Sequence, residues 1–412
     1  MAGYTLLRGL RIIEVAQLGP ASLGGYLADM GAEVIKVEGL EGDPVRDRGS
    51  PALGSPHGLG LLHLRWNRGK KSIGVDLKSA AGAALFRRLV SSADVLIEGM
   101  RGGVLERLGL GFDTLRASNR KLVFCSISGL GLSGPYHRLG SHGPSFDAFG
   151  ALSSINPYAL TPEEQQRSQV TPVGMHAMGL HAALGVLAAV IQAQRSGAGA
   201  QIEVAAAESA AHWRPDAVDS VLNEAHTHVR PGFLGGQGRM ACWPRLCRYD
   251  TRDGRGVFFQ ALSPKFWTRF CAAIGRKDLE ERYDAPRDVN DIDEQVHVEL
   301  TALFATRTLA AWMALFLEHD VPGCPANTVR ELASDPHFLA RENIYEVELP
   351  GTGTLRLTST PVKVAGQQFA PDLAPGLGQH TEEVLRSVLG LDAREIADLQ
   401  ATGAVFGLAT AR

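Results

Sequence analysis

The chain has 412 residues, of which 45% are hydrophobic and 21% are charged, and its formal net charge is −3 at pH 7. This length favours about two to three domains with a sizeable core, and the composition excludes a disordered or collagen-like chain. The balance of 41 Lys and Arg against 44 Asp and Glu argues against nucleic-acid binding, which usually needs a basic excess or stripe. It leaves room for a local basic pocket that holds an anionic ligand.

The cysteines and the chain start indicate a soluble, cytoplasmic protein. The cysteine count of five is odd, no C-x-x-C is present, and most of these residues have apolar neighbours, as reduced structural thiols do. No His or Cys pair has the spacing of a metal site, so we expect no metal. No signal-peptide pattern follows Met1, and the apolar run over 179–190 is too short to span a bilayer.

Strand-like and helix-like runs alternate through the first half of the chain. The pattern predicts helices over 21–30 and 80–91, a long loop over 39–60 that is rich in Gly, Pro and charge, and strands over 10–15, 33–38, 72–77, 94–98 and 121–128. Strands separated by helix-length segments indicate βαβ units and a parallel sheet. A long helix over 175–195 then ends at a Gly-rich stop, and a short strand begins at residue 202.

The pattern changes near Pro215. A strand over 257–262 and helices over 264–274 and 308–319 predict a smaller α/β module. Two short strands within 347–364, separated by a Gly turn, and a closing helix over 382–389 complete the chain. We find no internal repeat.

Gly129, Gly131 and Gly134 form a G-x-G-x-x-G pattern directly after a predicted strand. In a dinucleotide-binding fold this pattern opens a helix. The PYHRLG that follows Gly134 does not read as a helix start, so we expect no nicotinamide or flavin cofactor. The sequence also has no P-loop and no G-x-S-x-G elbow, and spacing selects no Ser-His-Asp combination.

Several segments together carry a family resemblance. They are LRGLRIIEVAQLGPASLGGYLADMGAEVIKVE with GDPVR, WNRGKKSIGVDLKS, DVLIEGMRGGVLERLGLGFDTL, SISGLGLSGP, GLHAALGVLAAVIQAQRSGAGAQIEV, ALSPKFW and LGQHTEEVL. The chain resembles the class III CoA-transferases, or CaiB-BaiF family, which includes formyl-CoA transferase, α-methylacyl-CoA racemase and the benzylsuccinate CoA-transferase subunits. The resemblance covers nearly the whole chain, and it rests on the number and order of the motifs.

The resemblance implies an α/β fold with a Rossmann-like large domain and a smaller α/β domain, in an interlocked dimer. The large domain would be built from both chain ends, residues 1–214 and 331–412, and the small domain from residues 215–330. The residues alone give the α/β alternation and the change near Pro215. The interlocking comes only from the resemblance.

The resemblance also implies a reaction, in which CoA moves from an acyl-CoA donor, such as succinyl-CoA, to a carboxylic acid. In the family, a nucleophilic Asp attacks the thioester, forms a mixed anhydride, and then becomes an enzyme thioester of CoA. That Asp lies at the start of the long helix, four residues before one Gly and ten before another. Here those glycines are Gly179 and Gly185, so the position is Met175, and residues 165–201 contain no Asp or Glu.

Two interpretations of Met175 stay open. The chain is either a non-nucleophilic subunit, paired in a heterodimer or heterotetramer with a homologous sister chain that carries the Asp, or a homodimer in which His176 or Asp147 replaces the carboxylate. We favour the paired subunit, because the family does not use the position of Asp147 as a nucleophile. A histidine such as His176 could not form the usual anhydride.

Racemases of this family use a His and the same Asp on opposite faces of the substrate, with a supporting Glu. The His position matches His142 in SHGPSFD, the Asp position is again Met175, and Ser263 stands in place of the Glu. Only one of the three groups is present, which disfavours a racemase. A non-catalytic acyl-CoA-binding protein is a further alternative.

The CoA site implied by the resemblance is better preserved than the nucleophile. Gln17, as a catalytic candidate, and its neighbours match the loop at the thioester, and cationic residues match positions that hold CoA phosphates and adenine. The alternative for each cationic residue is a solvated surface side chain, and the alternative for the glycine-rich loop is an ordinary turn. Two departures are Gly99, where many members have Asn, and Gly39, where formyl-CoA transferase has Arg. The expected CoA-binding residues are Ala16, Gln17, Leu18, Lys70, Met100 and Arg107, and the expected mobile glycine-rich loop is Gly235, Gly236, Gln237 and Gly238.

Overall fold

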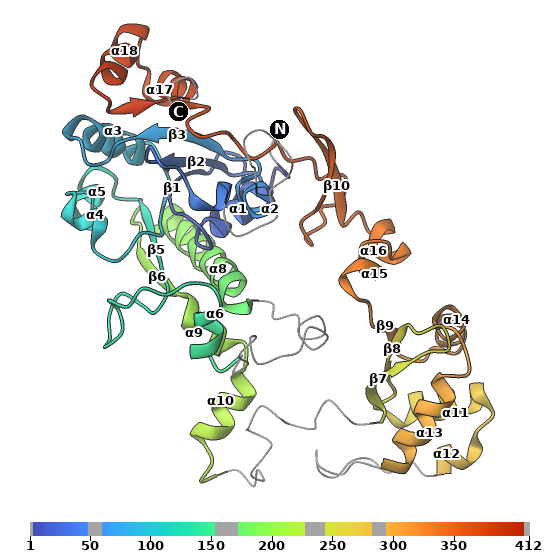
Figure 1. Cartoon of the computed structure of the whole chain (residues 1–412). Coiled ribbons are helices and arrows are strands. Elements are labelled where there is room, and N and C mark those ends of the chain that lie inside the picture. The colour runs from blue at the N-terminus through green and yellow to red at the C-terminus, as the bar shows by residue number, and fades with distance from the viewer. Residues whose placement is uncertain (1–2, 48–59, 153–171, 227–243, 282–293, 408–412) are drawn as a thin grey trace. The chain divides into compact units, whose positions relative to one another are not determined.

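The computed structural model describes residues 3–47, 60–152, 172–226, 244–281 and 294–407. The chain forms two compact units, one made of Met1–Pro215 with Asn343–Arg412 and the other of Asp216–Glu342 (Figure 1). The first unit is therefore built from both ends of the chain. The second junction lies beyond the expected residue 330, because two short helices, α15 (Val329–Leu332) and α16 (Pro336–Ala340), belong to the second unit.

A seven-stranded sheet forms the centre of the first unit, in the order β12-β3-β2-β1-β4-β5-β6. Every pairing in it is parallel except that of β12 with β3, so the prediction of a parallel α/β sheet is confirmed. The strand order reverses between β1 and β4, and open α/β sheets bind ligands at such a switch point. The bounds are β1 (Arg11–Val15), β2 (Glu33–Glu38), β3 (Lys71–Val75), β4 (Val95–Glu98), β5 (Val123–Ser128), β6 (Gln201–Ala205) and β12 (Val405–Phe406).

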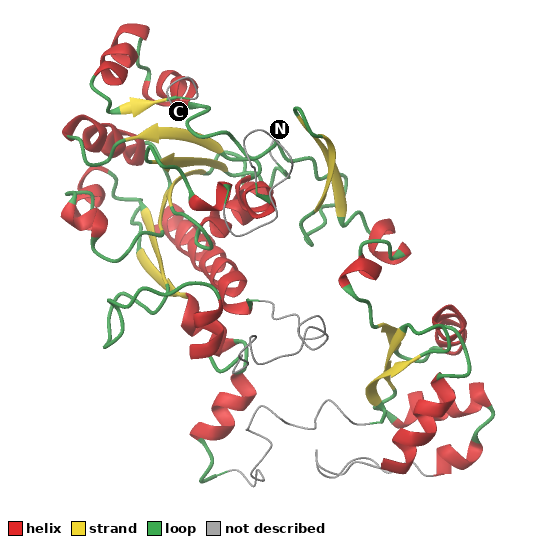
Figure 2. Ribbon diagram, in the orientation of Figure 1, coloured by secondary structure: helices red, strands yellow, loops and turns green. Residues whose placement is uncertain are grey.

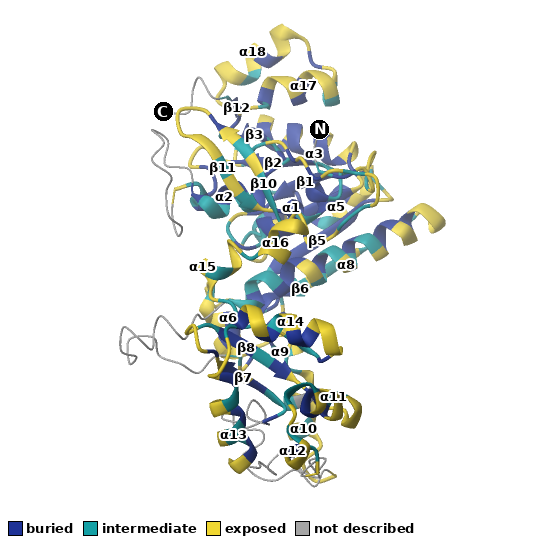
Figure 3. Ribbon diagram, turned by 90° about the vertical axis from the view of Figure 1, so that its right-hand side faces the viewer, coloured by how far each residue is buried: buried dark blue, intermediate teal, exposed yellow. Residues whose placement is uncertain are grey.

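Helices cover both faces of this sheet (Figure 2), and β1, β4 and β5 are buried (Figure 3). One hydrophobic cluster joins the sheet to α3, α5, α17 and α18, and a second joins it to α1, α6, α8 and α9. Burial on both faces explains why the strands read as nearly continuous apolar runs. The bounds are α1 (Ala21–Asp29), α2 (Leu61–Asn67), α3 (Ala80–Ser91), α4 (Val104–Arg107), α5 (Phe112–Ser118), α6 (Pro144–Phe149), α8 (Val173–Ser196), α9 (Ala206–His212), α17 (Thr381–Leu389) and α18 (Ala393–Ala401).

Helix α8 extends beyond both ends of the apolar run over 179–190. It has 24 residues, close to the predicted 175–195, and by length and composition alone it could cross a membrane, whereas the expectation concerned only the shorter apolar run over 179–190. In the fold α8 contacts α1, α9 and β5 and buries Met178, Ala182 and Val186 in the second cluster. It ends at Gly197, whose φ of 74° is the left-handed conformation that favours glycine at a helix end.

Some elements of the first unit were not expected. The predicted loop over 39–60 contains a short 3-10 helix, η1 (Pro44–Arg46), and α2 follows it. Both helices are too short to show a clear apolar period in the sequence. Helices of this length are stabilised by tertiary contacts and not by intrinsic propensity. The hairpin of β10 (Ile344–Leu349) and β11 (Gly353–Thr358) is antiparallel with a Gly turn, as the sequence predicts.

The second unit packs helices on a three-stranded antiparallel sheet around an aromatic cluster. The indole N–H of Trp267 donates to the Leu279 carbonyl at 3.0 Å, so this buried ring keeps its hydrogen bond. Helix α10 (Pro215–Leu222) begins at the junction of the units. The bounds are β7 (Leu246–Asp250), β8 (Gly256–Gln260), β9 (Gly323–Pro325), α11 (Pro264–Ile274), α12 (Lys277–Glu281), α13 (Glu294–Phe304) and α14 (Leu309–His319).

Candidate active site

A cavity of about 540 Å³ lies at the switch point of the large sheet. The segments that follow β1, β4 and β5 line it, together with the start of α6 and the first turns of α8. Its volume falls in the range of about 300–1,000 Å³ that is usual for small-molecule sites. The fold therefore places a ligand-sized cavity where a doubly wound sheet binds its ligands.

The cavity brings together some of the residues that the sequence singled out. Gln17, Leu18, Met100, His142 and Met175 line it. Four other expected residues do not line the cavity: Ala16, Lys70, Arg107 and His176. The glycine-rich loop, Gly235 to Gly238, lies outside the described residues.

The G-x-G-x-x-G segment after β5 also lines the cavity, through Gly129 and Gly131. No helix begins at Gly134, and the next helix along the chain, α6, begins at Pro144. The segment is therefore a loop that approaches the cavity with its backbone. It does not have the strand–turn–helix geometry by which a dinucleotide fold binds pyrophosphate.

Met175 occupies the first turn of α8 and faces the cavity across Gly19. A Cβ atom at Gly19 would lie 2.7 Å from Met175 Cγ and 2.8 Å from Met178 Cε, so only glycine permits this approach. The thioether of methionine is a weak acceptor without an ionisable proton. The position that the resemblance aligns with the family's nucleophile thus lines the cavity, and it holds a side chain that cannot form an acyl anhydride.

The two proposed replacements for the carboxylate have other roles. Asp147 is buried, and its Oδ1 accepts a hydrogen bond from the Gly174 N–H at 2.8 Å, which caps the first turn of α8. His176 is half-buried with its ring 6.3 Å from that of Trp66, and burial and the nearby Arg65 charge lower its pKa. Neither residue lines the cavity, so neither is placed as a nucleophile.

The expectation that Lys70 holds a CoA phosphate does not fit its position. Its side chain is fully buried, and its Nζ donates to both Glu14 carboxylate oxygens at 2.8 Å and to the Ala21 carbonyl at 2.7 Å. Burial lowers the pKa of Lys70 to about 8, although the Glu14 charge opposes this change. The ammonium donors are already used inside the fold, so Lys70 is a structural cation here.

Arg101 lines the cavity, whereas the expected Arg107 lies outside its lining. Arg107 is exposed on α4, and its Nη1 lies 3.1 Å from where a Cβ atom of Gly103 would be. Arg101, which sequence reasoning missed, lines the cavity, and its Nη2 lies 3.0 Å from the corresponding point at Gly140. Neither arginine forms an ion pair with any described residue. The sequence signal that could have indicated Arg101 is its place next to the Gly-Gly that follows β4, with Arg107 shortly after it.

The loop after β1 is held in place by Asp43. Asp43 Oδ1 accepts hydrogen bonds from the N–H groups of Leu18 and Val45, each at 3.0 Å. Leu18 has a φ of 56°, which is strained for a residue with a side chain. The Gln17 amide donates to the Gly42 carbonyl at 3.3 Å, so the β2–η1 segment fixes two cavity residues of this loop, Gln17 and Leu18.

Asp43 belongs to a buried ion cluster, which contains Glu14, Lys36, Glu38, Asp43, Arg46 and Lys70. Lys36 Nζ lies 3.0 Å from Asp43 Oδ2 and 3.3 Å from Glu14 Oε1, with all three side chains fully buried. Burial alone would lower the pKa of Lys36, but these acids together raise it. The Lys36 ammonium also donates to the Ala16 carbonyl, so the cluster contacts the backbone next to Gln17.

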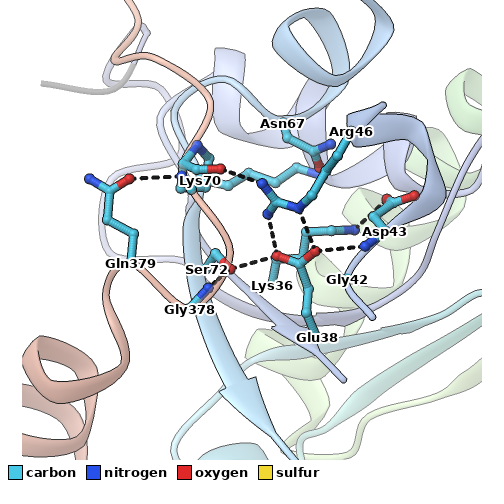
Figure 4. A network of polar contacts seen from close by, with 12 residues as sticks. Lys36, Glu38, Gly42, Asp43, Arg46, Asn67, Lys70, Ser72, Gly378 and Gln379 are labelled. Atoms are coloured by element: carbon cyan, nitrogen blue, oxygen red, sulfur yellow. Dashed lines mark hydrogen bonds and ion pairs between the residues drawn. The ribbon is translucent and has the colours of Figure 1, made fainter. Parts of the chain in front are cut away.

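The other end of the buried ion cluster reaches the C-terminal part of the chain (Figure 4). Arg46 pairs with Glu38 at 2.5 Å and donates to the Pro375 carbonyl at 2.8 Å. Ser72 donates to Glu38 at 2.5 Å and accepts from the Gly378 N–H at 2.9 Å. Three acids and three cations balance in charge, as buried groups must. The cluster thus ties the cavity loop to both chain ends of the large unit.

The sequence of the chain matches the family model of CoA-transferase family III over residues 7–381. This chain belongs to CoA-transferase family III. It is 30% identical to succinyl-CoA–D-citramalate CoA-transferase of Chloroflexus aurantiacus, over 96% of this chain and 97% of that protein. It is 32% identical to the succinyl-CoA–L-malate CoA-transferase alpha subunit of Chloroflexus aurantiacus, over 96% of this chain and 91% of that protein.

Solved structures of the CaiB-BaiF family have the same fold. A crystal structure of Rv3272 from M. tuberculosis matches with a TM-score of 0.75 and 28% identity, covering 93% of this chain and 99% of that one. A CaiB/BaiF family protein from Brucella suis matches with a TM-score of 0.74 and 25% identity, over 94% of this chain and 100% of that one. The names of the family and of the relatives indicate CoA-transferase activity, which uses CoA thioesters as substrates.

Glu98 is a buried acid that forms no ion pair with any described residue. Glu98 ends β4, directly before the cavity residues Gly99 and Met100, and is 3% exposed. Its Oε1 has no hydrogen-bond partner among the described residues, and burial raises its pKa from 4.5 to about 7. The ionised carboxylate is therefore disfavoured in the folded protein.

Replacing this acid is expected to stabilise the protein in a pH-dependent way. Because the folded pKa of Glu98 is raised, the wild type loses stability as pH rises from 4.5 to about 7, by at most about 3 kcal/mol. Glu98→Gln removes the ionisable group, so we expect it to be about 1–3 kcal/mol more stable than the wild type at pH 8 and much closer to it at pH 5. Urea unfolding at both pH values measures this, with the exposed Glu41→Gln as control. If the variant and the wild type differ in free energy of unfolding by the same amount at pH 5 and pH 8, the prediction is wrong.

Proposed function

We propose that this chain is a subunit of a cytoplasmic class III CoA-transferase that lacks the nucleophilic aspartate. Its homologous sister chain would carry that residue, and the two would form an interlocked heterodimer or heterotetramer. The assembly would move CoA from an acyl-CoA donor, such as succinyl-CoA, to a carboxylic acid. One observation carries the proposal: Met175 faces the cavity at the nucleophile position, and no Asp or Glu is among the described residues that line it.

Two further facts support the paired arrangement. The loop of Gln17 and Leu18 and the cation Arg101 line the cavity, which is compatible with CoA binding, although no described lining residue is a carboxylate. Relatives named as alpha and beta subunits of succinyl-CoA–L-malate CoA-transferase are 32% and 29% identical to this chain. A family that contains named subunits can accommodate a chain without a nucleophile.

The experiment compares the chain alone with the chain co-expressed with a family member from the same genome that carries the aspartate. Liquid chromatography follows the transfer of CoA from succinyl-CoA to a panel of carboxylic acids. We expect transfer only from the co-purified complex, and its loss when the sister chain's aspartate is replaced by asparagine. Robust transfer by this chain alone would overturn the proposal.

A second candidate function rests on His142, which lines the cavity and can exchange a proton. In that case the chain would be a homodimeric acyl-CoA isomerase or racemase with altered catalytic groups. Deuterium uptake from D2O into the α-carbon of a 2-methylacyl-CoA tests it. Uptake by the chain alone that disappears in His142→Ala would favour this function over the paired subunit.

A further inference from the structure

The cavity separates its polar and apolar residues by depth. The side chains of Trp66, Ile127, Phe146 and Met178 are all buried, between 1% and 7% exposed, and none of them carries a charge. Met175 adds a half-buried thioether beside them. The inner wall is therefore made of hydrocarbon, aromatic and thioether groups.

The charged and imidazole groups lie at the outer side. Arg101, His137 and His142 line the cavity and are exposed, as is the amide of Gln17. A polyanionic nucleotide can be met by such groups in contact with water. No cation among the described lining residues reaches the buried wall.

This separation discriminates between acyl groups. A distal carboxylate pressed against Ile127, Phe146 and Met178 would lose its water without gaining a partner, which is strongly unfavourable. An alkyl or aryl group would gain about fourfold in affinity for each methylene that it buries. The flexible, polarisable side chains of Met175 and Met178 can adjust to chains of different shape.

We infer that this cavity binds the acyl part of an aliphatic or aromatic monocarboxylic acyl-CoA and disfavours dicarboxylic acyl groups such as succinyl. The inference rests on the proposed function, because it takes a CoA thioester as the ligand. It sets this chain apart from the relatives whose names specify malate, citramalate or glutarate, which are dicarboxylates. In a paired enzyme, the succinyl donor would then be handled by the sister chain.

Calorimetric titration of the purified full-length chain tests the inference at pH 7. The probes are CoA, acetyl-CoA, hexanoyl-CoA, phenylacetyl-CoA and succinyl-CoA. We expect hexanoyl-CoA and phenylacetyl-CoA to bind at least about tenfold more tightly than acetyl-CoA, and succinyl-CoA to bind no more tightly than acetyl-CoA. Succinyl-CoA binding as tightly as hexanoyl-CoA would overturn the inference and leave the proposed function standing. If the complex transfers no CoA but the chain still prefers hexanoyl-CoA, the proposed function is overturned and the inference stands.

A matched pair of variants locates the selectivity. Met175→Arg places a cation at the inner wall and is expected to shift the ratio of succinyl-CoA to hexanoyl-CoA affinity by about tenfold toward succinyl-CoA. Leu184→Arg adds the same charge on α8 at a residue that is 69% exposed and outside the cavity lining, and it is expected to leave that ratio unchanged. An equal shift in both variants would show a general charge effect and would contradict the placement. The wild-type titration decides the inference even if one variant does not fold.

Discussion

Replacing Glu14 with glutamine is expected to lower the free energy of unfolding by about 3–5 kcal/mol. The Glu14 carboxylate is fully buried and pairs with two ammonium groups, Lys36 at 3.3 Å and Lys70 at 2.8 Å. A neutral amide leaves both cations in the interior with one anion fewer. Because burial already lowers the pKa of Lys70 to about 8, loss of Glu14 would lower it further and drive this lysine toward its neutral form.

The neighbouring strand provides a matched control. Glu33 in β2 also pairs with two cations, Arg11 at 2.7 Å and Lys71 at 3.1 Å, but its side chain is 32% exposed. Glu33→Gln is therefore expected to cost less than about 1 kcal/mol. Urea unfolding followed by circular dichroism compares the two variants. Equal, small losses for Glu14→Gln and Glu33→Gln would show that the buried ion cluster does not stabilise the large unit.

The buried ion cluster also marks the limit of what the sequence could predict. Apolar runs located the strands correctly, because β1, β4 and β5 are covered on both faces. They could not show that Lys36, in the middle of EVIKVE, is fully buried. Its partners come from β1 and from the segment after β2, so only the folded chain brings the charges together. For the same reason the sequence could not show that Lys70, which the resemblance assigned to CoA binding, is fully buried.

The sequence located some residues of the candidate site and missed others. Family resemblance located the residues that directly follow β1 and β4, such as Gln17 and Met100, because strand ends in a parallel sheet lie at one edge. Resemblance offered no reason to choose Arg101, whose guanidinium meets the cavity only through its packing beside Gly140. The apolar inner wall was equally hidden, since it combines α6, α8 and β5 from distant parts of the chain.

Introducing the missing carboxylate with Met175→Asp is expected to create a covalent step in this chain. The position lies in the first turn of α8 and faces the cavity, and a helix N-terminus favours an ionised carboxylate. That carboxylate would attack the thioester carbonyl of a bound acyl-CoA. The carbon–sulfur bond breaks, CoA leaves as its thiolate, and the acyl group remains on the protein as a mixed anhydride. Thiolate attack on the anhydride then releases the acid and leaves CoA bound as a thioester.

Hydroxylamine intercepts either covalent species and converts the new carboxyl group to a hydroxamate, which mass spectrometry locates at position 175. With hexanoyl-CoA as the probe, we expect thioester cleavage at least about a hundredfold faster than in the wild type, because the reacting groups are held together. Met175→Asn has nearly the same size and no nucleophilic oxygen anion, so it should remain unlabelled. A folded Met175→Asp chain that binds hexanoyl-CoA but forms no hydroxamate would show that the thioester does not reach the first turn of α8. In that case the absence of an acid from the described lining of the cavity would no longer support the proposed sister chain.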